Sequence, residues 1–401
     1  MTVFACICLP ILGAATLDPS PPAAEASAPA PSADTSIEKH APPTLAGGSH
    51  RSDLGGDPVP SPPAPSEQPK KSGNVIVPIL LYTPETHFGV GGLFIHLFRL
   101  KREADARLSS IAVVGMITTR RQAVFEVHPD IYWASDDLHV FGRVEYQKYP
   151  DSFWGIGNSA DDASEERYER TRLRYRPVVQ LRIAGHAYAG LFGDAMWFSG
   201  EYLDPNGMFA TRNVPGEDGG VTVGLGPTLT FDSRDNTVAT ISGWLINATF
   251  TEFSPTFGSH YSFRKFQLDA RWFTPTAYEQ VLAVHAYSEV QGKDVPYYHL
   301  GMLGGDELLR GYYLGRYRDE NLVALDVEYR VPVYWRFGAV AFAGAGMVSE
   351  RLQDLPAAPV RWAVGSGLRF AVNQEEHLNL RLDFGIGPDT RGFYFTAREA
   401  F

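Results

Sequence analysis

The stretch ERTRLRYRPVVQLRIAG, residues 169 to 185, decides the fold, because polar and apolar side chains alternate along it. Its even positions include Arg170, Arg172, Arg174 and Arg176, and its odd positions include Leu173, Tyr175, Val179, Leu181 and Ile183. A period of two is the pattern of a β-strand whose two faces meet different surroundings. We therefore predict a strand here, with a polar face that carries a basic stripe and an opposite apolar face.

The same alternation recurs along the chain in about sixteen runs, which start between residues 75 and 391. Alternating strands also occur in soluble β-sandwiches, but an even number of runs, each roughly 9 to 11 residues long, is what a closed transmembrane barrel needs. A closed barrel satisfies every backbone hydrogen-bonding group without water. We predict an all-β fold: an antiparallel transmembrane β-barrel of about 16 strands, with apolar faces toward lipid and the basic stripe toward the lumen.

Connections between the predicted strands alternate between short and long. Residues 184–187 and 332–336 are short connections, whereas residues 150–167, 199–219 and 291–320 are long ones. Outer-membrane barrels have this asymmetry, with short periplasmic turns and long outer loops.

The N-terminal part of the chain differs sharply in composition from the rest. MTVFACICLPILGAA, residues 1–15, is an apolar run that ends in small residues and predicts a secretory signal peptide, although a wrongly assigned start or a short membrane segment fits the same run. Residues 17–72 contain 13 prolines and no Phe, Tyr or Trp, so they cannot bury enough apolar area to offset their ordering entropy. We predict a signal peptide over 1–15, a Pro/Ala/Ser-rich disordered linker over 16–73 and the barrel over 74–401.

Charge and cysteine content exclude several functions. The net charge of −11 argues against nucleic-acid binding. The only cysteines are Cys6 and Cys8, which excludes a disulfide framework and a Cys-based metal site in the rest of the chain. No GxSxG elbow and no HExxH sequence is present, and we predict no enzyme activity, no metal site and no cofactor.

A glycine-flanked arginine stands out in the longest predicted loop. LGGDELLRGYYLGRY, residues 303–317, places Arg310 before Gly311, and the following strand NLVALDVEYRVPV alternates Asp326 and Glu328 with apolar residues. A loop folded into the lumen could pair Arg310 with a wall carboxylate, because an unpaired buried guanidinium is costly. Glu328 is the reachable partner. The other interpretation is a solvated arginine at the tip of a mobile loop.

The last predicted strand ends in an aromatic residue. In GFYFTAREAF, residues 392–401, we expect Phe393, Phe395 and Phe401 on one face and Tyr394, Thr396 and Arg398 on the other. A final strand that ends in this way resembles the C-terminal sorting signal of bacterial outer-membrane proteins, and we assign that role to Phe401.

Several of these motifs together resemble the BamA/TamA superfamily of outer-membrane barrels, the bacterial surface antigen family, over about residues 74–401. The motifs are LGGDELLRGYYLGRY, LDVEYRVPV, FGAVAFAGAGMV, LTFDSRDN and FWGIGNSADDASEERY. The resemblance implies sixteen strands, a loop folded into the lumen and a weak seam between the first and last strands. It also implies that Leu309, Arg310, Gly311 and Tyr312 are the family's conserved loop tetrapeptide.

The sequence departs from that family at two places. The family often carries an acidic residue in an FxDxG pattern on the strand after the EYR strand, whereas this chain has Gly344 there. We therefore expect Glu328 to hold Arg310 alone or with Asp326, Asp269 or Asp383. Classical members also place POTRA modules before the barrel, and here we see only a proline-rich linker, which weakens the expectation of insertase or secretion activity.

Two classes of function remain open at this point. The first is a barrel without its own POTRA domains that takes part in protein insertion, assembly or translocation, or in lipid transport, with an unidentified periplasmic partner protein. The second is a passive pore or a surface-exposed structural protein of the outer membrane. In both cases we expect localisation in the bacterial outer membrane, contact with outer-membrane lipid and lipopolysaccharide, and insertion by the barrel assembly machinery.

Overall fold

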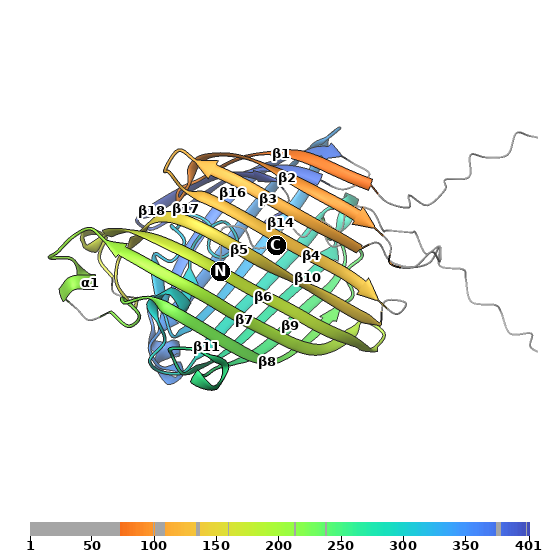
Figure 1. The fold of residues 1–401 in the computed structure, drawn as a ribbon. Helices are drawn as coiled ribbons and strands as arrows, with labels where there is room; N and C mark the ends of the chain where they lie inside the picture. The colour runs from red at the N-terminus through yellow and green to blue at the C-terminus, as the bar shows by residue number, and fades with distance from the viewer. Residues whose placement is uncertain are drawn as a thin grey trace, which may run out of the picture. The chain divides into compact units, whose positions relative to one another are not determined.

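The barrel predicted from the alternation is confirmed by the computed structural model, which contains a closed ring of sixteen antiparallel strands (Figure 1). The structure describes residues 73–98, 100, 109–133, 137–158, 160–211, 214–236, 239–373, 378–397 and 399–401. The predicted signal peptide and all but the last residue of the predicted linker lie outside the described residues. No helix among the described residues is long and apolar enough to cross a membrane.

The sixteen wall strands follow one another around the ring in chain order, and two short strands lie within one connection. The wall strands are β1 (Gly73–Thr83), β2 (His87–Phe98), β3 (Ser109–Thr118), β4 (Ala123–Trp133), β5 (Leu138–Phe153), β6 (Glu166–Ala184), β7 (Ala187–Tyr202), β8 (Gly220–Asp232), β9 (Gly243–Phe253), β10 (Phe263–Pro275), β11 (Val281–Gln291), β14 (Asn321–Tyr334), β15 (Phe337–Ser349), β16 (Arg361–Asn373), β17 (Leu378–Gly387) and β18 (Thr390–Ala397). The two short strands are β12 (Gly301–Leu303) and β13 (Tyr317–Asp319).

Helices are few and short among the described residues. One α-helical turn, α1 (Met208–Thr211), lies in the connection between β7 and β8. The 3₁₀ turns are Asp162–Ser164, Pro255–Phe257, Ala277–Glu279, Tyr297–His299 and Leu352–Ala357.

Because each strand reverses the direction of the one before it, the three longest connections between wall strands share one end of the barrel, together with the short turn at residues 84–86. Residues 154–165, 203–219 and 292–320 connect strands at the long-loop end. Residues 185–186 and 335–336 connect strands at the short-turn end. The asymmetry expected from the sequence is therefore present.

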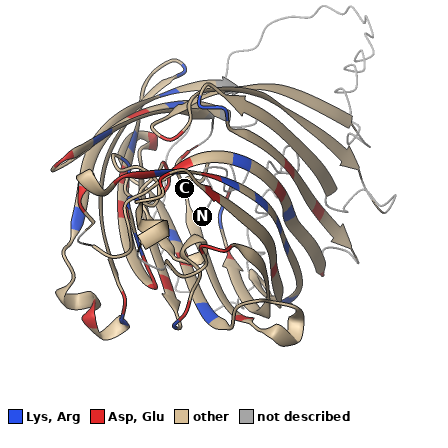
Figure 2. Cartoon of the chain, turned by 60° about the vertical axis from the view of Figure 1, so that its left-hand side comes forward, with Lys and Arg blue, Asp and Glu red and all other residues tan. Residues whose placement is uncertain are grey.

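The two faces of the wall differ as the alternation predicts. On β6 the outward row is exposed and apolar, with Leu173, Tyr175, Leu181 and Ile183 among its members. Arg170, Arg172 and Arg174 point the other way and are buried. Positive and negative residues are interspersed along the barrel (Figure 2). Charges of both signs can therefore neutralise one another inside the barrel.

An apolar cluster covers the lumen near the long-loop end. Phe153, Tyr168, Phe198 and Phe253 come from the ends of wall strands. They pack against Met208, Phe209, Val214, Val295, Tyr297 and Tyr298 from two of the long connections. The long loops therefore have a core of their own.

The ring closes over a short length between its first and last strands. Among the described residues, β1 and β18 share the single registered pair Tyr82↔Phe395. On its other side β1 pairs with β2 along its whole length, from Gly73↔Leu97 to Thr83↔His87. Most of β1 therefore has a registered partner on one side only, which leaves a strand edge at this seam.

Candidate functional site: a loop clamped beside the seam

The longest connection, residues 292–320, folds back into the barrel, and we call it the lumen loop. Its strands β12 and β13 pair with each other through Gly301↔Asp319, Met302↔Arg318 and Leu303↔Tyr317. Apolar residues of the loop form one buried cluster with the wall; they are Leu303, Leu308, Leu309, Tyr312 and Tyr317 against Tyr287, Leu322, Ala324, Val348 and Ala363. Burial of this apolar surface stabilises the inward position of the loop.

Arg310 lies at the tip of the lumen loop and is only 1% exposed. Its Nη1 atom is 2.7 Å from Glu328 Oε2 and 2.7 Å from Asp383 Oδ2. Its Cζ atom lies 3.6 Å from the centre of the Phe342 ring, which adds a cation–π contact. Burial alone would lower the pKa of Arg310, but the two carboxylates raise it above its ordinary value, so the guanidinium stays charged. We call Arg310, Glu328 and Asp383 the clamp.

The structure shows which carboxylates hold Arg310 in this chain, where Gly344 stands in place of the acidic residue that the family often carries. Asp383 on β17 is the second carboxylate on Arg310. Asp326 instead accepts a hydrogen bond from the backbone N–H of Leu309 at 3.3 Å. Asp269 pairs with Arg271 on its own strand, β10. A Cβ at Gly344 would overlap Asp326 Oδ1, so the family's carboxylate would require the Asp326 side chain to move.

Glycines on the neighbouring wall admit the loop tip. A Cβ at Gly385 would overlap the carbonyl oxygen of Arg310, and one at Gly387 would lie 2.7 Å from the hydroxyl of Tyr312. Leu309 adopts the left-handed backbone conformation, with φ of 62°, which costs about 1 to 3 kcal/mol. The contacts around the tip offset this strain. The tetrapeptide 309–312 therefore packs directly against the wall of β17.

The lumen loop contacts both sides of the seam. On the β18 side, the N–H of Gly311 donates to Tyr394 Oη at 2.9 Å, and Thr390 Oγ1 donates to the carbonyl of Gly311 at 2.7 Å. On the β1 side, the N–H of Leu314 donates to Glu85 Oε1 at 2.8 Å. Glu85 lies in the turn between β1 and β2, and burial raises its pKa to about 7. The loop thus connects the two sides of the seam, where β1 and β18 share a single registered pair.

A comparison of the sequence with protein-family models identifies this barrel. The Omp85 superfamily domain matches residues 114–401. The chain belongs to the Omp85 superfamily. This confirms the resemblance to the BamA/TamA barrels, and it makes the chain an outer-membrane β-barrel by family. No curated protein sequence matches the chain significantly.

Solved structures of Omp85 proteins have the same fold. BamA from Haemophilus ducreyi, in a form lacking POTRA domains 1–3, superposes with a TM-score of 0.55 at 14% identity, over 81% of this chain and 70% of that one. CdiB from Acinetobacter baumannii gives 0.53 at 12% identity, over 82% of this chain. CdiB from Escherichia coli gives 0.55 at 13% identity, over 80% of this chain. This chain spans only 60% and 62% of the two CdiB chains.

The four arginines of the predicted basic stripe lie on β6 of this Omp85 barrel, and carboxylates neutralise three of them. Arg170 Nε is 2.8 Å from Asp151 Oδ2, and Arg172 Nη2 is 2.5 Å from Glu145 Oε1. Arg174 forms a two-point pair with Asp194, with Nε 2.8 Å from Oδ1. Arg176 is half-buried farther along the strand. The stripe is therefore a ladder of ion pairs and not an uncompensated positive surface.

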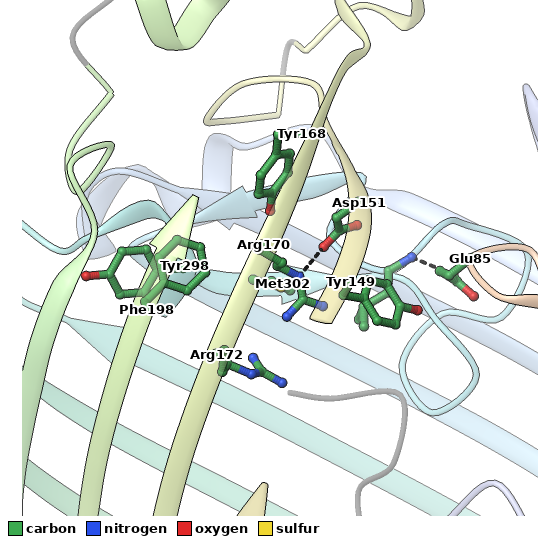
Figure 3. Close-up of a pocket in the computed structure, with 10 residues that line it drawn as sticks. Glu85, Tyr149, Asp151, Tyr168, Arg170, Arg172, Phe198, Tyr298 and Met302 are labelled. Atoms are coloured by element: carbon green, nitrogen blue, oxygen red, sulfur yellow. Dashed lines mark hydrogen bonds and ion pairs between the residues drawn. The ribbon is translucent and has the colours of Figure 1, made fainter. Parts of the chain in front are cut away.

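A small pocket lies where this stripe meets the lumen loop (Figure 3). Arg170 and Arg172 of β6 line it together with Tyr149, Met302 and Leu314, and Figure 3 shows the Arg170–Asp151 pair on one side and Glu85 on the other. In the part of the chain that the structure describes, no group of three His, Cys, Asp or Glu side chains could hold a metal ion.

Phe401 does not lie where the sequence pattern placed it. β18 ends at Ala397, and Phe401 is 8% exposed among lumen residues instead of continuing the outward row of Phe393. Both views place the C-terminal end of the chain within the outline of the barrel (Figures 1 and 2). Arg330 Nη2 donates to the Phe401 carbonyl at 3.0 Å, which draws the segment inward. The expected position on the lipid-facing row is wrong, and the sorting role remains a prediction.

Sequence reasoning missed four residues that complete the site: Phe342, Arg369, Tyr394 and Glu85. Arg369 Nη1 is 2.5 Å from Asp383 Oδ1 and so supports the clamp from β16. The alternation in RWAVGSGLRF places Arg369 on the same face as Gly365 and Gly367, which was a usable signal. Glu85 gave no such signal, because it is one of three residues in a short turn.

Proposed function

We propose that this Omp85 barrel takes part in protein insertion, assembly or translocation, or in lipid transport, at the bacterial outer membrane. The observation that carries the proposal is the lumen loop, clamped through Arg310 and bridging a seam with the single registered pair Tyr82↔Phe395. A lumen that contains a buried loop is a poor passive pore. A narrow seam bridged by a removable loop is suited to a wall that opens sideways.

The chemistry of the wall supports the same proposal. Its outward face is apolar and would contact outer-membrane lipid, and the chain itself would be inserted by the barrel assembly machinery. Client delivery would use a periplasmic partner protein. Neither an enzymatic reaction nor a cofactor is needed for this role.

Conductance separates this proposal from the passive pore. We expect the purified barrel in a planar lipid bilayer to give small, flickering openings, because the lumen loop obstructs the path. Phe342→Ala, which removes the ring stacked on Arg310, should enlarge the openings. Large, steady openings of the unaltered protein would favour a passive pore.

Reconstitution tests the role itself. Vesicles that contain the barrel and a periplasmic chaperone extract should accelerate folding of an unfolded outer-membrane protein, or transfer of a fluorescent phospholipid between leaflets. Vesicles with a disulfide across the seam, introduced by Tyr82→Cys and Phe395→Cys in a Cys6→Ser/Cys8→Ser background, should lose that acceleration until a reductant is added. Equal acceleration by the oxidised and reduced barrels would contradict a sideways-opening wall.

A further inference from the structure

Beyond the clamp, a second segment folds into the lumen and fills a pocket in its wall. The segment is Glu399–Phe401, and the pocket is formed by Phe273, Val281, Ala283 and His285 with Arg330. We propose that this pocket is a peptide-binding site for an extended segment with a carboxylate two residues before an aromatic ring, and that Glu399–Phe401 is its resident occupant. The inference deepens the proposed function and rests on it, because the ligand class is a polypeptide.

The aromatic part of the site is enclosed on several sides. The ring of Phe401 has its centre 5.0 Å from that of His285 and 6.5 Å from that of Phe273. Arg330 Cζ lies 5.8 Å from the centre of the same ring. Ala400 is also buried, against the same cluster of small and apolar residues. A ring in this position gains apolar burial and a cation–π contact together.

The polar part of the site fixes the spacing of the ligand. Arg369 Nε donates to Glu399 Oε2 at 2.6 Å, and Asn379 Nδ2 donates to Glu399 Oε1 at 2.8 Å. Arg330 Nη2 donates to the carbonyl of Phe401 at 3.0 Å. Both carboxylate oxygens and one backbone carbonyl of the occupant are therefore recognised. A segment with an amide in place of the carboxylate, or without the ring, would lose one of these anchors.

The segment Glu399–Phe401 is not part of the strand ladder, so another peptide can replace it in the pocket. Antiparallel pairing continued from Tyr82↔Phe395 would bring Phe401 opposite Ile76 on β1. The chain instead leaves β18 after Ala397, and Ile76 remains 77% exposed. Side-chain contacts and one hydrogen bond to backbone hold the segment, and a peptide with the same side chains would meet the same groups.

The pocket is connected to the clamp through two shared residues. Arg330, which binds Phe401, also lies 2.7 Å from Glu328. Arg369, which binds Glu399, also lies 2.5 Å from Asp383 and 3.6 Å from Glu328. These two carboxylates hold Arg310. If Glu399 left the pocket, Arg369 would interact more strongly with Glu328 and Asp383. Occupancy of the peptide site would thus change how tightly the lumen loop is held.

A direct binding measurement tests the site. The probe is a fluorescein-labelled, C-terminally amidated TAREAF peptide, and the receptor is the full chain with Glu399→Ala and Phe401→Ala, refolded in detergent and checked for heat-modifiable migration. We expect TAREAF to bind saturably. The peptides TAREAA and TARQAF should each bind with about tenfold lower affinity, and Arg330→Gln in the receptor should lower the affinity for TAREAF about tenfold. Absence of saturable binding, or equal binding of TAREAF and TAREAA, would overturn the proposal.

A second measurement keeps the native segment in place. Ala283→Cys and Ala400→Cys, in a Cys6→Ser/Cys8→Ser background, put one thiol on each side of the buried cluster. We expect an intramolecular crosslink in the folded barrel, formed more slowly in excess TAREAF but not in excess TAREAA. A crosslink rate that saturating TAREAF leaves unchanged would overturn exchange. Both assays measure binding in the lumen alone, so the seam disulfide still tests the proposed function separately if they fail.

Discussion

Buried ion pairs on the β5–β7 side of the barrel have a different structural role from those on the seam side. Arg172–Glu145 and Arg174–Asp194 join neighbouring strands, and β5 and β6 are already paired from Leu138↔Leu181 to Phe153↔Glu166. On the seam side Arg369–Asp383 likewise joins neighbouring strands, but further pairs join the wall to segments outside the ladder, namely Arg310 of the lumen loop and Glu399. Charges therefore reinforce an existing ladder on both sides, and on the seam side they also hold segments that no ladder holds.

This difference explains how the barrel can be closed and yet have a narrow seam. A β-ladder dissolves only when many backbone hydrogen bonds break together, whereas a clamp of one arginine and two carboxylates can be released by a single competing charge. The seam side is thus the part of the wall whose closure depends on few groups. Substitutions on the two sides should therefore differ in their effects, and the largest difference is expected at the clamp.

The largest effect should come from Arg310→Ala, which removes a buried cation that contacts both Glu328 and Asp383, while Arg369 stays close to both carboxylates. We expect the free energy of unfolding to fall by at most about 5 kcal/mol and the conductance to rise. Denaturant unfolding of the refolded barrel and bilayer recordings measure the two quantities.

Arg174→Ala is the matched control on the other side of the barrel. It also removes a buried cation and should lower stability, but it should leave the conductance unchanged, because Arg174 joins one wall strand to the next. A double-mutant cycle between Arg310→Ala and Glu328→Ala should give a coupling of about 1 to 3 kcal/mol. Additive effects would show that these two residues do not interact in solution.

The second prediction concerns pH and Glu85, a residue that is 2% exposed and lies in the turn between β1 and β2. Its pKa is raised from 4.5 to about 7, chiefly by burial, so the folded barrel holds this proton more tightly than the unfolded chain. Stability must therefore fall as pH rises from about 4.5 to about 7, by up to about 3 kcal/mol from this group. Glu85→Gln should remove that part of the pH dependence in unfolding measured at pH 4.5 and pH 8.

Glu320→Gln is the control that tests whether the pH dependence of the conductance comes from Glu85. Its pKa is also raised to about 7, by burial and by the neighbouring Asp319 and Glu350, but it lies beside β13 and not in the turn at the seam. Between pH 5 and pH 8, the wild-type conductance should increase, because burial disfavours the charged form of Glu85 more than the Leu314 N–H stabilises it, which favours release of Glu85 from the loop. Glu320→Gln should keep this increase and Glu85→Gln should lose it. The opposite pattern would assign the pH dependence to Glu320, beside β13, and not to the turn at the seam.

The third prediction uses the space left by a glycine. Gly385→Ala would make a Cβ overlap the carbonyl oxygen of Arg310, so either the loop tip or β17 must shift, at a cost of about 1 to 3 kcal/mol. Gly115→Ala on β3 is the control, because a Cβ there meets nothing within 4 Å. We expect the control to change stability by less than about 0.5 kcal/mol. Equal effects of the two substitutions would mean that the tip does not contact the wall.

The strands could be predicted closely from the sequence, whereas the contacts between distant segments could not. The strand predicted in residues 169–185 corresponds to β6, and NLVALDVEYRVPV lies within β14, because alternation between lipid and lumen is imposed on every wall residue. The pairing of Arg310 with Glu328 was a reachable hypothesis, since the two are close in sequence. Asp383 remained one of several alternatives, because the path of the loop across the lumen decides which acid it meets.

The position of Phe401 shows where local periodicity stops predicting the structure. The alternation in GFYFTAREAF continues to the last residue, but the ladder hydrogen bonds that residues 399–401 could form opposite β1 compete with contacts in the lumen. Arg330 and Arg369 offer the last three residues charge-assisted hydrogen bonds inside the lumen. Neither arginine is close to Phe401 in sequence, so only the tertiary fold reveals the competition.

The smallest effect should distinguish the two sides of the barrel by function instead of stability. Thr390→Val removes the 2.7 Å hydrogen bond to the carbonyl of Gly311, and Thr228→Val removes a buried 2.9 Å contact with Thr249 between β8 and β9. Each change keeps the shape of the side chain and should cost about 0.5 to 1.5 kcal/mol in unfolding. Only Thr390→Val loosens the lumen loop, so it alone should lengthen the open times in bilayer recordings. If Thr228→Val lengthened them equally, gating would depend on overall barrel stability, and the contrast between a seam held by few groups and a wall held by its ladder would fail.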